Sequence, residues 1–361
     1  MKKLKIMDLF AGVGGLTYGF YHNDNYEVVV ANEILPNMAK AYTLNHPDVK
    51  MYCDDIKNLS LSQMTKDLGI KKGDIDIIVG GPPCQAYSTV GKRLLDDPRG
   101  KLFQEYYRIL KEFEPKFFLF ENVKGLLSMH GGELLPTIVD SFSSLGYKVK
   151  YQVLNAVDYG APQVRERVII TGTKLKSEFA YPKPTHGKDL KPHLTLCDAI
   201  GDLPFIGNGE ESFEYASAPK NDFQKKMRKG APAKLMDHNA PKNADHLIKI
   251  MEHLPEGGSP KDIPEEIRPK SGFGNTYCRM WWDRPSTTIT RNLGTPSSSR
   301  CIHPKATRAL TTREGARIQC FPDTYQFYGS KSDRNLQIGN AVPTALSEAM
   351  ASAILKHFSS K

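Results

Sequence analysis

A cysteine behind two prolines is the residue of this sequence best suited to covalent chemistry. Cys84 follows Gly-Gly-Pro-Pro at 80–83, which comes directly after the apolar run at 75–79. Such a run predicts a short buried strand, and open parallel α/β sheets bind ligands at the carboxyl ends of their strands. The prolines fix φ and disfavour helix before them, so we expect the thiol on a stiff turn facing a cleft. This window alone leaves two interpretations open, a nucleophile or a small buried hydrophobic residue.

Two further windows place charged groups near that turn. Glu121 follows the apolar residues 117–120, at the end of the strand expected beside the one that delivers Cys84. A carboxyl group in an apolar rim favours its protonated form and can donate a proton. Arg165 and Arg167 precede a later strand, and side-chain alternation predicts that both point to one face. They are either surface charges or part of the same cleft.

A glycine-rich turn, DLFAGVGGL at 8–16, follows the first predicted strand and opens a helix. Glycines there let the backbone approach a ligand and leave N–H groups free at the helix start. Glu33, at the end of the second strand, is placed to accept hydrogen bonds from a ribose. Thr17 replaces the third glycine of the dinucleotide fingerprint, which disfavours a nicotinamide dehydrogenase. Asp8 at the start of the turn opposes pyrophosphate and favours a ligand with positive charge, such as the amino group of S-adenosylmethionine.

Alternating strands and helices position these residues. Strands are predicted at 5–10, 27–32, 51–56, 74–79, 116–123, 147–156 and 167–173, with helices from about 16 and at 37–45, 102–113, 133–145 and 341–358. This alternation implies parallel βαβ units. From Lys183 to about Pro304 the rhythm disappears and Pro, Gly and Ser become frequent. We therefore predict domains at 1–183 and 184–329, with residues 330–361 rejoining the first.

The charge pattern points to a polyanionic partner. The net charge is +9, and residues 268–313 hold nine basic residues and one acid, with both tryptophans among them. Arginine and aromatic residues in loops suit nucleic-acid phosphates and bases, although a charge run is also compatible with a solvated basic face. No two of the six cysteines have a zinc-ligand spacing, so no metal is expected. With no apolar run of about 18 residues and no signal-like start, we expect a cytoplasmic protein that spans no membrane.

Nine windows in order give the chain a resemblance to the DNA (cytosine-5)-methyltransferases, covering almost its whole length. They are DLFAGVGGL, NEI, DDI, GGPPCQAYSTVGKR, DPRGKLF, FENVKGL, QVRER, RALTTREGARIQCFPD and QIGNAVP. The resemblance implies a Rossmann-like, S-adenosylmethionine-dependent methyltransferase fold of the α/β class, with a mixed, mostly parallel sheet. It also implies that 1–183 is the catalytic and cofactor-binding domain and that 184–329 is a smaller, irregular target-recognition domain. Tyr87 stands where the family commonly has phenylalanine.

The resemblance also implies the reaction and its residues. Cys84 would attack C6 of a flipped cytosine in duplex DNA, C5 would take the methyl group, and loss of the C5 proton and of Cys84 would restore the ring. Glu121 would sit at N3 and Arg165 at O2. The S-adenosylmethionine contacts would be Phe10, Gly12, Gly14, Gly15, Glu33, Ile34, Asp55, Ile56, Pro83, Leu102, Asn340 and Val342. The DNA contacts would be Ser88, Lys92, Arg93, Arg99, Arg279, Arg291 and Arg300.

Two other functions stay open at this point. The tRNA-modifying branch of the family carries a Cys-Phe-Thr signature. No cysteine in the variable region of this chain is followed by Phe-Thr, so DNA is the favoured substrate. A non-catalytic DNA-binding regulator would have no need of Cys84, Glu121 and Arg165 together. A restriction endonuclease of the same site is a candidate partner, and a monomer is the expected state.

Overall fold

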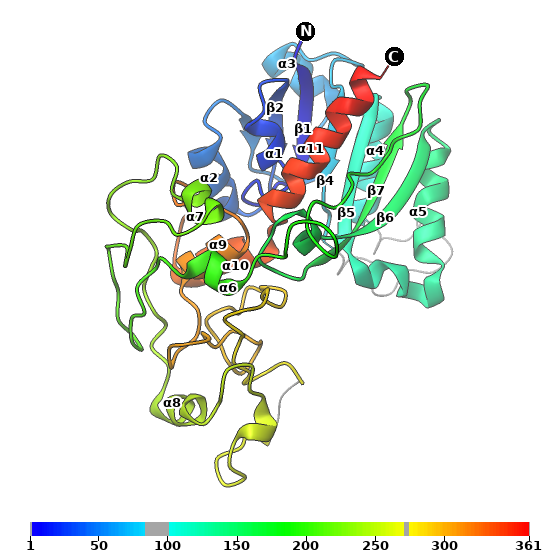
Figure 1. The fold of residues 1–361 in the computed structure, drawn as a ribbon. Coiled ribbons are helices and arrows are strands. Elements are labelled where there is room, and N and C mark those ends of the chain that lie inside the picture. Colours follow the sequence, from blue (N-terminus) through cyan, green and yellow to red (C-terminus); the bar gives the residue numbers. More distant parts are fainter. Residues whose placement is uncertain (1, 84–100, 271–273, 361) are drawn as a thin grey trace. The chain divides into compact units, whose positions relative to one another are not determined.

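The computed structural model describes residues 2–83, 101–270 and 274–360. The chain divides into two compact units (Figure 1). The first comprises Met1–Asn155, Glu166–Lys183 and Leu346–Lys361, and the second Ala156–Arg165 and Pro184–Ala345. The chain thus leaves the first unit after Lys183 and returns at Leu346. Residues 330–345, which the sequence analysis groups with the C-terminal segment, lie in the second unit.

The first unit is built on a seven-stranded sheet with the order β3-β2-β1-β4-β5-β7-β6. Its strands are β1 (Leu4–Leu9), β2 (Tyr26–Asn32), β3 (Lys50–Tyr52), β4 (Ile77–Gly80), β5 (Phe117–Val123), β6 (Lys148–Asn155) and β7 (Glu166–Thr173). Neighbours from β3 to β5 are parallel, whereas β7 runs antiparallel to both β5 and β6. The predicted α/β fold with a mixed, mostly parallel sheet is confirmed.

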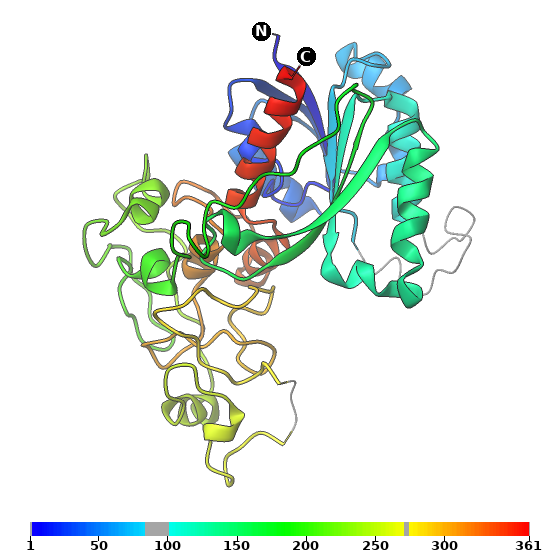
Figure 2. The ribbon, with the colours of Figure 1, turned by 45° about the vertical axis from the view of Figure 1, so that its right-hand side comes forward.

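Helices cover both faces of this sheet. They are α1 (Tyr18–Tyr21), α2 (Pro36–Asn45), α3 (Leu61–Leu68), α4 (Lys101–Phe113), α5 (Leu134–Ser143) and α11 (Thr344–Ser359). On one face, apolar side chains of α4 and α5 join those of the central strands in one buried core. On the other face lies α11, where the Tyr26 hydroxyl donates to the Ala351 carbonyl at 2.6 Å. Figure 2 shows α11 and α5 on opposite sides of the sheet.

A glycine allows α1 and α11 to approach each other closely. A Cβ on Gly19 would lie 2.4 Å from the backbone nitrogen of Glu348, so only glycine allows this contact. The Gly19 amide donates to the Ser347 hydroxyl at 2.8 Å, which joins the two helices by a buried hydrogen bond. The C-terminal helix is therefore fixed on the sheet beside the turn that follows β1.

Short helices and isolated bridges make up the second unit. The helices are α6 (Leu196–Ile200), α7 (Asp222–Met227), α8 (Asp245–Glu252), α9 (Thr312–Ile318) and α10 (Lys331–Asn340). Single bridges such as Arg279↔Ile302 replace extended ladders. Buried ion pairs help to hold this irregular chain: Arg308 donates both of its terminal nitrogens to Glu314 at 2.8 Å. The loss of βαβ rhythm expected after Lys183 is what the described residues show.

Candidate active site

The turn after β1 leaves open space at a position suited to a ligand. Phe10 and Gly12 both have left-handed backbone, with φ of 55° and 56°. A Cβ on Gly12 would meet no atom within 4 Å, so glycine here serves conformation and access rather than packing. The Gly12 amide donates to Glu33 Oε2 at 2.8 Å, which ties the turn to the end of β2. Gly14, predicted as a further contact, also has positive φ, at 89°.

Glu33 and Ile34 form the second side of this region. Glu33 is buried, and its carboxylate accepts hydrogen bonds from the amides of Gly12 and Leu35, each at 2.8 Å. Burial raises the pKa of Glu33, and these backbone hydrogen bonds lower it in part. The neighbouring Ile34 is 58% exposed although it is apolar. An open glycine turn, a carboxylate held by backbone amides and an exposed apolar side chain fit an adenosine-containing ligand.

Asp8 has a different role from the one expected from the sequence. Its carboxylate is buried and accepts a hydrogen bond from the Thr17 hydroxyl. Burial raises the pKa of Asp8 well above its ordinary value, and the nearby Glu33 raises it further. Asp8 therefore fixes the turn from inside and presents no exposed charge. Thr17 supplies the bonding hydroxyl at the position where the dinucleotide fingerprint has a third glycine.

The remaining predicted cofactor residues of the first unit take ordinary structural positions. Asp55 caps the short helix η1 (Ile56–Asn58) by accepting from the Lys57 amide at 3.1 Å. Ile56 is buried, and Leu102 packs half-buried against the core of the sheet. Their ligand contacts, and that of Gly15, stay predictions.

The turn before Cys84 lies against Glu121, as the strand order predicts. Gly80 at the end of β4 pairs with Phe120 of β5. A Cβ on Gly81 would lie 2.6 Å from Glu121 Oε2, so this glycine lets the turn approach the carboxylate. The Asn122 side-chain amide donates to the Pro82 carbonyl at 3.1 Å and fixes the turn. Pro83 is exposed, and Cys84 lies just outside the described residues.

Arg167 is the described partner of Glu121. Its Nε lies 2.7 Å from Glu121 Oε1, and both side chains are largely buried, at 12% and 13% exposure. Glu121 and Arg167 come from adjacent antiparallel strands, where Val123 pairs with Arg167. The carboxylate therefore lies between a guanidinium at one oxygen and the Gly81 turn at the other. This pairing with a cation corrects the expectation of a purely apolar rim.

Arg165 makes its described contacts elsewhere. It belongs to the second unit, where its guanidinium donates to the carbonyls of Ile289 at 2.7 Å and Gly339 at 2.9 Å. The expectation that Arg165 and Arg167 share one face assumes a strand through both residues. Because β7 begins only at Glu166, alternation does not extend to Arg165. The sequence signal for Arg167 was present, but it did not distinguish the two arginines.

The predicted DNA contacts fall into three groups. Ser88, Lys92, Arg93 and Arg99 lie outside the described residues. Arg291 is exposed, and Arg300 is half-buried. Arg279 is buried, and its guanidinium donates to four carbonyl oxygens, those of Met251, Leu254, His303 and Ala306. The expected DNA contact at Arg279 is therefore revised to a structural role, because its donors are already used inside the unit.

The last predicted cofactor residues, Asn340 and Val342, lie in the second unit. A Cβ on Gly339 would lie 2.1 Å from the Arg291 backbone nitrogen, so α10 packs tightly on the chain at 290–291. Asn340, the last residue of α10, is exposed, and Val342 is buried. Their contacts with a cofactor stay predictions.

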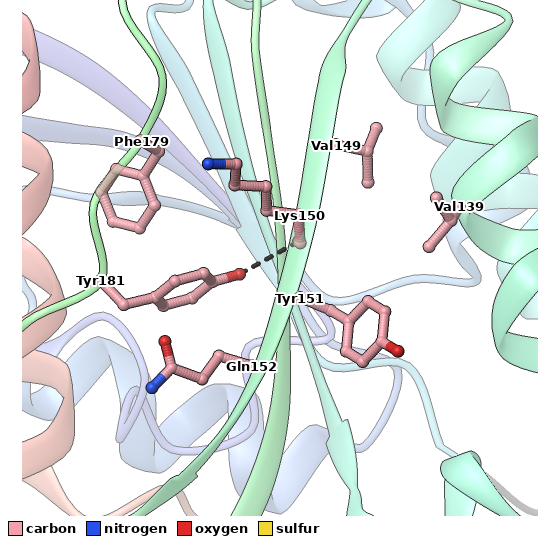
Figure 3. A pocket seen from close by; sticks show the side chains of 7 residues that line it. All are labelled: Val139, Val149, Lys150, Tyr151, Gln152, Phe179 and Tyr181. Carbon is pink, nitrogen blue, oxygen red and sulfur yellow. Dashed lines mark hydrogen bonds between the residues drawn. The ribbon is translucent and has the colours of Figure 1, made fainter.

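A surface pocket of the first unit lies apart from these residues. It has a volume of about 490 Å³ and is lined by Val139, Val149, Lys150, Tyr151, Gln152, Phe179 and Tyr181 (Figure 3). The Tyr181 hydroxyl donates across it to the Lys150 carbonyl at 3.0 Å. None of the predicted site residues within the described ranges lines this pocket. Among the described helices, none is long and apolar enough to cross a membrane.

Comparison with known proteins identifies the family. The C-5 cytosine-specific DNA methylase family model matches residues 4–356. The chain is 36% identical over 356 residues to the Type II methyltransferase M1.HphI of Haemophilus parahaemolyticus, covering 98% of this chain and 87% of the relative. It is 38% identical to the Type II methyltransferase M.DdeI of Desulfomicrobium norvegicum, covering 98% of this chain and 89% of the relative.

A solved structure gives the same result for the fold. A prophage-encoded DNA modification methyltransferase from E. coli superposes with a TM-score of 0.80 at 26% identity, covering 99% of this chain and all of the other. This chain belongs to the C-5 cytosine-specific DNA methylase family.

Proposed function

We propose that this protein transfers a methyl group from S-adenosylmethionine to C5 of cytosine within a short sequence of duplex DNA. The observation that carries the proposal is the contact between the turn leading to Cys84 and the carboxylate of Glu121. It brings the family's nucleophile-bearing turn and its acidic residue to one edge of one sheet. The match of the family model over residues 4–356 supports the same reaction class.

The cofactor fits the first unit through three described features. The open space at Gly12 leaves room for the ligand to approach the glycine turn. The Glu33 carboxylate suits the ribose hydroxyls, and the exposed Ile34 suits packing on adenine. S-adenosylmethionine, when bound, supplies an electrophilic methyl group. The protein's part is to hold it at the carboxyl ends of β1 and β2, on the same sheet edge as Glu121.

Unactivated C5 of cytosine is a poor nucleophile, so the reaction needs covalent help. We propose that the Cys84 thiolate adds to C6, which pushes electron density to C5. Glu121 donates a proton to N3 of the ring and so neutralises the negative charge that develops there. After methyl transfer, loss of the C5 proton expels the thiolate and restores the aromatic ring. The base must leave the duplex for this contact to form.

The structure supports Arg167 as the residue that positions Glu121 in this scheme. A guanidinium 2.7 Å from one carboxylate oxygen fixes the direction in which the other oxygen points. Arg165 stays the sequence-based candidate for the base O2, and its bonds to Ile289 and Gly339 suggest that it also holds its unit together. We propose that the second unit recognises the target sequence and that a restriction endonuclease reads the same site. A monomer acting on cellular DNA is consistent with this scheme.

Transfer of labelled methyl groups tests the reaction. The protein is expected to label unmethylated duplex DNA and to leave tRNA unlabelled, and Cys84→Ala is expected to abolish labelling. DNA containing 5-fluorocytosine should stay attached to Cys84, because that base has no C5 proton to lose. Labelling of tRNA alone would favour the RNA-modifying alternative. DNA binding without labelling of either nucleic acid would favour the regulator. Bisulfite sequencing of DNA from expressing cells would give the target sequence.

A further inference from the structure

The two adjacent tryptophans of the second unit face different surroundings. The Trp282 ring lies edge-on to Phe205, with centroids 5.5 Å apart, and packs against a small apolar core that includes Leu203 and Leu235. The Trp281 ring instead has two guanidinium groups over it. Arg300 Cζ lies 4.4 Å and Arg284 Cζ 5.5 Å from its centroid. Trp282 is therefore explained by packing, whereas Trp281 carries a cationic cluster.

Backbone atoms of neighbouring residues hold Trp281 and Arg300 of this cluster, Arg284–Trp281–Arg300, in place. A Cβ on Gly257 would lie 2.0 Å from Trp281 Nε1, so the indole rests directly on a glycine with φ of 75°. Arg300 Nη1 donates to three carbonyl oxygens, those of Gly257, Gly258 and Arg279. The indole and one guanidinium are thus fixed before any ligand arrives, which lowers the entropy cost of binding.

The charge of the cluster is not neutralised within the described part of the chain. There, no carboxylate lies within ion-pair distance of Arg284 or Arg300, although the buried Arg308 and Arg317 of the same unit are paired. The nearby Glu256 is already engaged by Lys305 at 2.5 Å and by the Trp282 amide at 2.7 Å. Arg284 is exposed, and Trp281 and Arg300 are half-buried. The cluster therefore holds two positive charges over one indole, a fixed one at Arg300 and an exposed one at Arg284.

We propose that the Arg284–Trp281–Arg300 cluster binds a phosphate group of the DNA substrate, an inference that rests on the proposed function. A guanidinium stacked on an aromatic face keeps its N–H donors in the plane of the group, where they can bind phosphate oxygens. Phosphate contacts of this kind fix the register of a protein on the duplex without reading bases. Trp281 acts as the positioning residue, and Arg284 supplies the exposed donors.

The salt dependence of DNA binding tests the assignment. Binding of the full-length protein to one unmethylated duplex is measured by fluorescence anisotropy over a series of salt concentrations. Removing one bound phosphate from the interface should make the slope of log K against log salt shallower by about 0.9. We expect this change for Arg284→Gln. Lys66→Gln, on the exposed face of α3 in the first unit, removes the same charge and should leave the slope unchanged.

A second variant separates stacking from charge. Trp281→Leu keeps both arginines but removes their aromatic support, so it should weaken DNA binding. The double variant that combines Trp281→Leu with Arg284→Gln should have the same salt slope as Arg284→Gln alone. If Trp281→Leu fails to fold, Arg284→Gln decides alone. A wild-type slope for Arg284→Gln would overturn the proposal. Because binding is measured without methyl transfer, failure of the proposed reaction would be seen separately.

Discussion

Replacing Gly81 by alanine tests whether the position of Glu121 controls the reaction. The added Cβ would lie 2.6 Å from Glu121 Oε2, whereas a relaxed carbon–oxygen contact is about 3.3 Å. The carboxylate would therefore have to move by roughly 0.7 Å. Its other oxygen, Oε1, is held at 2.7 Å by Arg167 Nε. The carboxylate would therefore turn about this contact, and Oε2 would move away from the Gly81 turn.

The expected cost follows from the sensitivity of catalysis to geometry. A misplacement of about 1 Å can cost about 100-fold in rate, so we expect the single-turnover rate constant of methyl transfer to fall by roughly 10- to 100-fold. This corresponds to about 1.4–2.7 kcal/mol of activation free energy. Affinity for S-adenosylmethionine should be little changed, because Gly12, Glu33 and Ile34 lie in the segments that follow β1 and β2 rather than in the Gly81 turn.

Single-turnover methyl transfer to duplex DNA is the assay, with cofactor binding and thermal unfolding measured on the same preparations. Gly125→Ala is the matched control, because a Cβ there would meet only Val123 Cγ2 at 3.8 Å. A folded Gly81→Ala variant with the wild-type single-turnover rate constant would refute the role given to the carboxylate. An equal loss in both glycine variants would show that the effect does not come from Glu121.

Three further results are expected. Arg167→Ala leaves Glu121 without its cation and should lower the single-turnover rate constant of methyl transfer by about 100-fold; a wild-type rate constant would contradict the pairing. Burial lowers the pKa of His46 from 6.5 to about 4, so below pH 6.5 the unfolded state takes up a proton that the folded state does not. Up to about 3 kcal/mol of unfolding free energy is therefore lost as the pH falls from 6.5 to 4. Urea unfolding across that range should show a smaller loss for His46→Gln, and identical profiles would refute this. Gly19→Ala would bring a Cβ within 2.4 Å of the Glu348 nitrogen and should cost about 1–3 kcal/mol of unfolding free energy, seen as a lower Tm; an unchanged Tm would contradict the close packing.

The sheet and its edge follow from the sequence because short apolar runs bounded by turn residues leave few alternatives. The strands predicted at 5–10, 74–79 and 116–123 correspond to β1, β4 and β5, which are neighbours in the sheet. Hydrophobic burial fixes such strands locally, and the right-handed crossover rule then limits their order. The approach of the Cys84 turn to Glu121 was predictable for that reason.

Side-chain partners were less predictable, because they depend on atoms that a pattern does not specify. Asp8 was expected to face a ligand and instead accepts a bond from Thr17 inside the fold. Arg165 and Arg167 were expected on one face, but the first residue of β7 lies between them. For Arg165 a rule valid within a strand was extended past the strand's first residue, and for Asp8 the pattern did not show that the carboxylate is buried inside β1.

The basic segment at 268–313 shows why a count of charges does not give a surface. Arg279, Arg308 and Arg313 are all buried. In an irregular chain many carbonyl oxygens have no ladder partner, and each buried one needs a donor. A guanidinium has five donors and serves several carbonyls at once, as Arg279 does for four. The composition that predicts DNA binding is therefore partly the composition that an irregular unit needs to fold, and only arginines outside such networks, such as Arg284, remain candidates for phosphate.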